Sequence, residues 1–275
     1  MPLFGPNYES AGAGVSKHEK KKKPLAFYFE ILGRKFWKIL FTNALLVLFC
    51  IPIVTIGPAI TAATQVMRKF ITEQPIFLWD EFFTTFKKEF KRTFLVGIAD
   101  LVIAFLFIRG LGFYNSLLRG QESTGETILL ILMSAALFFV CMAHLYIYPM
   151  LASTELRIGA IIKNSLLLSI VGIWQNIISL AVIAGFAWLI WYTYPFCFFA
   201  FPLIPFGWML YTSVFNSYPI VQKFIINPYY EAKGETNPEL RNLPYEEETV
   251  FADMGGSEAP ITGKVKLKKK GKIVK

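Results

Sequence analysis

The sequence predicts an all-α fold, a polytopic transmembrane bundle of five or six membrane helices with amphipathic helices at the cytoplasmic interface. The chain of 275 residues is 55% hydrophobic and 16% aromatic, and its mean hydropathy is +0.48. Globular proteins average roughly 45–50% apolar residues, so this excess favours a membrane class. Several apolar runs also reach the length of about 20 residues that a helix needs to cross a bilayer core.

The net charge of +9 comes mostly from lysines at the two ends of the chain. Basic flanks of membrane helices explain this balance better than a nucleic-acid partner, which we do not expect. Three regions are predicted: a disordered basic N-terminal arm at 1–23, a transmembrane helical domain at 24–230, and a polar, Lys-rich cytoplasmic tail at 231–275. The tail either binds the anionic lipids of the bilayer, at about 1 kcal/mol for each well-placed lysine, or is solvated.

The first apolar run, Ile39–Ile56, contains Pro52 and is followed directly by Gly57 and Pro58. Proline lacks a backbone donor and clashes one turn back, so the helix is expected to bend or end near Pro52. Backbone groups freed at membrane depth must be satisfied by protein or by a wet cavity. The stretch therefore marks either a packed helical turn or a site.

A weaker apolar run at 57–71 is short and polar for a span. Cytoplasmic flanks of membrane helices carry an excess of Lys and Arg, and the basic segments of this chain fall on one side only if residues 39–71 cross twice or not at all. We favour two crossings with a turn near Pro52–Pro58, which gives six crossings and places both termini in the cytoplasm. The basic segments are the N-terminal arm, 68–92, 157–163 and the C-terminal tail.

Residues 76–94 carry aromatic side chains at helical spacing on one face and charged side chains on the other. This pattern predicts an amphipathic helix in the cytoplasmic interface. It serves either as a lipid anchor or as a docking site for a partner protein. The candidate interfacial or docking residues are Trp79, Phe82, Phe86, Lys88 and Phe90.

A second amphipathic cytoplasmic piece is expected at 155–164. The remaining spans are predicted from apolar runs of sufficient length. They are 95–118, 127–150, 165–192 and 196–224.

Several motifs of this chain resemble the YesL-like family of bacterial membrane proteins. The most specific is Ile51–Ala59, which reads Ile-Pro-Ile-Val-Thr-Ile-Gly-Pro-Ala, and others lie at 41–43, 82–91, 148–152 and 163–166. The resemblance extends over roughly residues 25–230 and leaves out the basic tail. It implies a bacterial plasma membrane, and an accessory role beside sugar ABC-transport systems with their permease subunits as partners. It implies no catalytic residues.

Asp100 is the sharpest candidate for a functional polar residue, because a carboxylate within a span is costly and marks a functional site by default. It is either a proton, cation or substrate site, or a packing residue paired with Asn43 or Gln175. His144 is either a proton relay or ligand or a satisfied histidine of the bundle. Asn43 and Gln175 are expected to form interhelical hydrogen bonds.

The sequence contains no P-loop, no nucleophile elbow, no H-E-x-x-H and no paired-carboxylate motif. We therefore expect no enzyme activity, no metal site and no cofactor, and rank an intramembrane enzyme last. The leading hypothesis is a non-enzymatic accessory or assembly component of a bacterial carbohydrate transport system. The alternative is a small transporter or channel in its own right, with Asp100 and the Pro52–Pro58 break lining its pathway.

Overall fold

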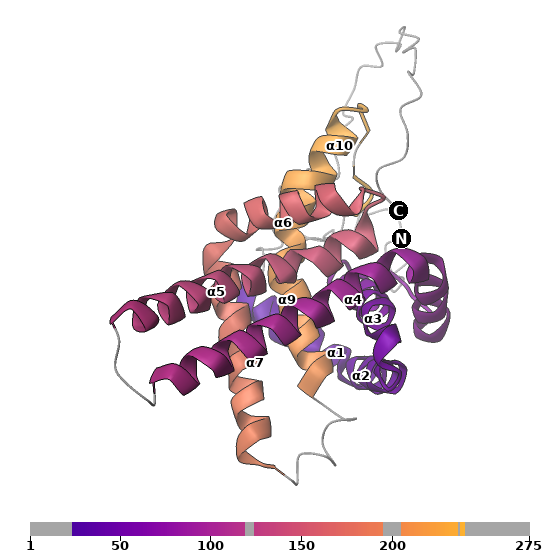
Figure 1. The fold of residues 1–275 in the computed structure, drawn as a ribbon. Helices are drawn as coiled ribbons and strands as arrows, with labels where there is room; N and C mark the ends of the chain where they lie inside the picture. Colours follow the sequence, from indigo (N-terminus) through magenta and orange to yellow (C-terminus); the bar gives the residue numbers. More distant parts are fainter. Residues whose placement is uncertain (1–23, 119–123, 195–204, 236, 240–275) are drawn as a thin grey trace, which may run out of the picture.

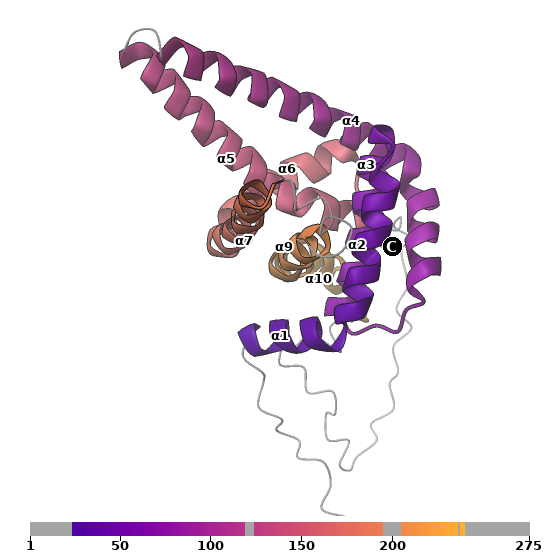
Figure 2. The same ribbon diagram turned by 90° about the horizontal axis from the view of Figure 1, so that it is seen from below.

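The computed structural model describes residues 24–118, 124–194, 205–235 and 237–239, and every regular element among them is helical (Figures 1 and 2). The expected N-terminal arm and residues 240–275 of the expected tail lie outside the described residues. The elements are α1 (Pro24–Arg34), α2 (Phe36–Cys50), η1 (Ile53–Thr55), α3 (Ile56–Ile71), α4 (Leu78–Leu118), α5 (Thr124–Ser153), α6 (Ile158–Val171), α7 (Ile173–Tyr192), α9 (Pro205–Val221), the π-helix η2 (Gln222–Ile226) and α10 (Asn227–Glu231).

Three described helices are long and apolar enough to cross a membrane, which confirms the predicted class of fold. The qualifying segments are Leu78–Gly110 in α4, Thr127–Ser153 in α5 and Ile173–Tyr192 in α7. Two shorter apolar helices, α2 and α6, accompany them. Few residues in the apolar segments of these three helices are buried inside the protein. This is expected of side chains that face the lipid of a bilayer.

Helix α3 is the buried centre of the bundle. Thirteen of its 16 residues are buried, and it contacts α2, α4, α5 and α9. Polar residues such as Thr61, Gln65 and Arg68 are buried on it together with small and apolar ones, and polar groups at membrane depth must be covered by protein. The run at 57–71, short for a span, is therefore an interior helix that the other helices surround.

Two glycines set the distance between α3 and α4. A Cβ atom placed on Gly97 would lie 2.8 Å from the Cα atom of Gly57, and a Cβ atom on Gly57 would collide with the carbonyl oxygen of Thr93. Small residues let helix backbones approach closely, and this replaces the hydrophobic driving force that lipid does not supply. The close crossing of α3 and α4 depends on the absence of a side chain at both positions.

The chain breaks between α2 and α3 where the prolines and the glycine stand. Pro52 has no N–H for the Leu48 carbonyl, which instead accepts from the Ile51 N–H at 3.4 Å. The hydroxyl of Thr55 donates to the carbonyl of Phe49 at 2.5 Å and lies 2.7 Å from that of Pro52. Pro58 falls in the first turn of α3, where a missing N–H is harmless, so the new helix continues through it.

Helix α4 is continuous over 41 residues, whereas the sequence predicted an interfacial helix at 76–94 followed by a separate span at 95–118. The predicted boundary was wrong, because neither Phe94 nor Leu95 is a residue that ends a helix. The amphipathic half and the apolar half therefore share one helical axis.

The region 155–192 also differs from its prediction. The sequence predicted an amphipathic piece at 155–164 and one span at 165–192, but α6 ends at Val171 and α7 begins at Ile173. Gly172 lies at this break, where a Cβ atom would meet the Tyr146 hydroxyl and Ile220. The side chain of Asn176 stabilises the break by donating to the Ser169 carbonyl at 2.9 Å and accepting from the Tyr146 hydroxyl at 2.8 Å.

One charged cluster closes the end of α3. The buried Arg68 guanidinium donates to Glu239 at 2.9 Å and to the Tyr218 hydroxyl at 3.2 Å, and the Tyr218 hydroxyl donates to the same carboxylate. Gln74 adds a hydrogen bond to Glu239 at 3.2 Å. The first part of the expected tail thus packs onto the bundle, because a buried guanidinium requires a counter-charge.

Replacing Gly97 by alanine is expected to destabilise the protein by about 1–3 kcal/mol, since the added methyl group forces α3 and α4 apart. Gly112→Ala on the same helix is the matched control, because no atom lies within 4 Å of a Cβ there. Thermal unfolding of the purified proteins in one detergent measures both. Equal melting temperatures for the two variants would contradict the role given to the glycine contact.

Candidate functional site

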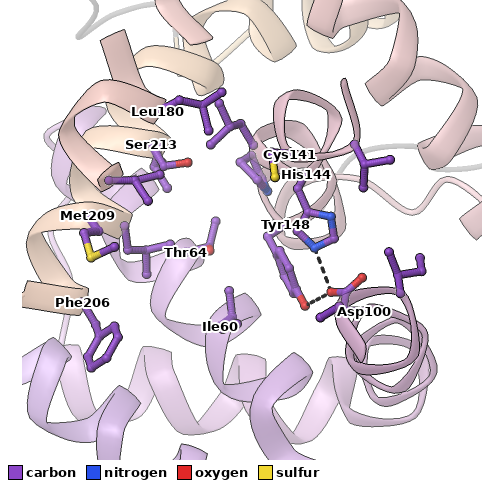
Figure 3. A pocket seen from close by; sticks show the side chains of 18 of the residues that line it. Ile60, Thr64, Asp100, Cys141, His144, Tyr148, Leu180, Phe206, Met209 and Ser213 are labelled. Atoms are coloured by element: carbon purple, nitrogen blue, oxygen red, sulfur yellow. Dashed lines mark hydrogen bonds and ion pairs between the residues drawn. The ribbon is translucent and has the colours of Figure 1, made fainter. Parts of the chain in front are cut away.

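Three polar side chains meet between α4 and α5. The Oδ2 atom of Asp100 lies 2.9 Å from the Nε2 atom of His144 and accepts from the Tyr148 hydroxyl at 2.6 Å (Figure 3). His144 and Tyr148 are four residues apart on α5, so they project from one face of that helix toward α4. The cluster joins two long helices that have few other polar groups at this level.

This Asp100–His144–Tyr148 cluster borders a cavity of about 490 Å³. Its walls come from α2, α3, α4, α5, α7 and α9, and Figure 3 shows Asp100, His144 and Tyr148 on one side and Phe206, Met209 and Ser213 on the other. A volume between about 300 and 1,000 Å³ is typical of small-molecule sites. The cavity is therefore large enough for a ligand of modest size.

A second cavity of about 320 Å³ lies on the other side of the cluster. Asp100 and His144 line both cavities, while the remaining walls of the second are apolar side chains of α4, α5 and α6. The side chain of Asp100 is 21% exposed and that of His144 is 33% exposed. The Asp100–His144 pair is thus half-buried and is accessible from both cavities.

The acidic and basic groups of the site are few. No lysine or arginine lines either cavity, and Asp100 is the one carboxylate in either lining. The lining therefore offers no fixed positive charge for an anionic ligand.

The partners proposed for Asp100 from the sequence lie elsewhere. Asn43 is fully buried, and its Oδ1 atom accepts from the backbone N–H of Gly207 at 2.6 Å, so it joins α2 to α9. Gln175 is exposed, and the amide buried at this level is the neighbouring Asn176. Tyr148 was missed as a partner, although its four-residue spacing from His144 is a signal that could have indicated it.

The aromatic stripe on the first half of α4 is partly used inside the protein. Phe82 is fully buried, and the ring of Phe49 lies 5.5 Å from that of Phe82 and 5.1 Å from that of Phe86, measured between centroids. Phe90 is half-buried, whereas Trp79 is 56% exposed and Lys88 is exposed. The outward surface of this segment is therefore mainly basic.

The helix break does not contribute to the cluster. Pro52, Gly57 and Pro58 line neither cavity. Among the described residues, no group of three or more His, Cys, Asp or Glu side chains is placed to hold a metal ion. The chemistry available in the cluster is proton exchange and the binding of a cation or a hydrogen-bond donor.

Tyr148→Phe is expected to lower the free energy of unfolding by about 1–3 kcal/mol, because the hydroxyl donates to a charged acceptor. Tyr192→Phe removes a hydroxyl from an exposed ring and serves as the control, with a change within about 0.5 kcal/mol. Chemical unfolding in mixed micelles measures both. In an Asp100→Asn background the effect of Tyr148→Phe should shrink, and an unchanged effect would show that the two groups are not coupled.

The site lies partly within the region for which a family is known. The profile of a family described as "Protein of unknown function, DUF624" matches residues 18–111, a range that includes Asp100 and ends before His144. No curated protein and no solved structure matches the chain. Over residues 18–111 the chain is similar to this DUF624 family, whose function is unknown.

Proposed function

We propose that the chain is a non-enzymatic accessory or assembly component of a bacterial carbohydrate transport system, held in the plasma membrane. The support is twofold: the resemblance to YesL-like proteins, and the composition of the cavity at the candidate site. The cavity walls favour an accessory protein over a sugar carrier, because of the hydrogen bonds that a carbohydrate requires.

A carbohydrate presents many hydroxyl groups, and each hydroxyl buried without a partner costs roughly 1–3 kcal/mol. Among the residues lining the larger cavity, the polar side chains are few and the others are aliphatic, aromatic or sulfur-containing. The polar ones are Thr64, Asp100, His144, Tyr148 and Ser213. Such walls suit a sugar poorly, which supports a role beside a carrier.

The exposed basic surface on the first half of α4 is the candidate contact with a permease subunit. Lys87, Lys88 and Lys91 are exposed, with Trp79 exposed at the start of the helix. A row of lysines suits either the acidic cytoplasmic surface of a partner or anionic lipid headgroups. The lipid bilayer itself is the other partner, and the Lys-rich tail adds to this contact.

A small transporter or channel remains the second candidate, because a carboxylate borders a membrane-level cavity. Solute uptake by proteoliposomes containing only this chain distinguishes the two. Uptake of a sugar by the isolated protein would overturn the accessory role. Recovery of permease subunits with the purified protein would support it.

Lys88→Glu is expected to reduce co-purification of permease subunits at least several-fold while leaving the membrane level of the protein unchanged. The side chain is exposed, so the charge reversal alters the surface and not the packing. Lys163→Glu, an exposed lysine of α6, is the matched control. Equal recovery of subunits with wild type and both variants would exclude docking through α4.

The proposed orientation places both ends of the chain in the cytoplasm. Single cysteines at Gly33 in α1, Gly125 in α5 and Glu231 in α10, in a background without other cysteines, test it with an impermeant thiol reagent on intact cells. Labelling at Gly125 alone is expected, since basic segments remain inside. Labelling at Gly33 would reject the double crossing of residues 39–71.

A further inference from the structure

We propose that the larger cavity binds a lipophilic ammonium compound, whose apolar body fills the cavity and whose charged nitrogen meets the carboxylate of Asp100. This inference goes beyond the proposed function and does not depend on it. It rests on the sign of the charge in the cavity, the composition of its walls and the way Asp100 is bonded.

The sign of the charge excludes an anionic ligand. Asp100 is the one carboxylate in the lining of either cavity, and no lysine or arginine accompanies it. A carboxylate at half-buried membrane depth is stabilised by a nearby positive charge, because Coulomb energies grow as the effective dielectric falls. Within the described lining, only a protonated His144 or a bound cation supplies that charge.

The bonding of Asp100 leaves room for a second donor. The hydrogen bonds from His144 and Tyr148 both end at Oδ2, so an ammonium group can approach the carboxylate through Oδ1. Thr64 also lines the cavity but is fully buried, and its hydroxyl has no hydrogen-bond partner among the described residues.

The side chains that line the cavity favour an apolar body for the ligand. Apart from the polar groups already named, the cavity is lined by side chains such as Phe107, Leu137, Phe206 and Met209. Its volume of about 490 Å³ accommodates an alkyl or aryl amine, and the apolar walls favour burial of that body. A phospholipid is disfavoured, because no basic side chain in the lining can pair with its phosphate.

The test is equilibrium binding of radiolabelled decylammonium to the full-length protein in phosphatidylcholine nanodiscs, with empty nanodiscs subtracted. At pH 8.5 we expect saturable binding of radiolabelled decylammonium. Decanol and decanoate should displace it at least tenfold less well than unlabelled decylammonium does. Phosphatidylethanolamine in the nanodiscs should leave the affinity unchanged, and competition by it would identify a lipid headgroup as the occupant and overturn the proposal.

Two variants locate the binding. Asp100→Asn should weaken binding at pH 8.5 at least tenfold, whereas Asp80→Asn, the same exchange at an exposed position of α4, should have no effect. The preference of the unaltered protein for decylammonium over decanol keeps the test valid if Asp100→Asn folds poorly. Unchanged binding in Asp100→Asn, or equal affinity for decanol, would overturn the proposal.

Discussion

The contact between Gly57 and Gly97 is the constraint on which the remaining architecture depends. It lets α3 and α4 approach without intervening side chains, and α3 in turn provides surfaces for α2, α5 and α9. The buried residues of α3 include two threonines, a glutamine and an arginine. These polar side chains would be unfavourable in contact with lipid. The helix is stable in the membrane because other helices surround it.

The cavities follow from the same arrangement. Figure 2 shows α4 and α5 close together near residues 118 and 124 and diverging toward the rest of the bundle. Where they diverge, Asp100 and His144 span the gap at 2.9 Å, and apolar walls from α7 and α9 face them across the larger cavity. One polar contact thus joins the two helices at the level where their backbones no longer pack tightly.

The sequence indicated the membrane class, the long spans and the interruption at Pro52 because each depends on local chemistry. Run length and the missing proline N–H act within a few residues, so they can be read without a partner. The partner of Asp100 and the burial of Phe82 depend on which helices meet, and one sequence carries little information about that. The break at Gly172 was missed because glycine in an apolar run signals close packing only once the opposing Tyr146 is known.

The pairing of Arg68 with Glu239 has a consequence for the order in which the protein is assembled. The two residues are 171 positions apart, so ribosomes complete α3 long before they deliver its counter-charge. A buried guanidinium without its carboxylate is destabilised by about 3–5 kcal/mol, so the packing around α3 is complete only once residue 239 has been synthesised. This contact therefore ties the stability of the first half of the bundle to a residue at the far end of the described chain.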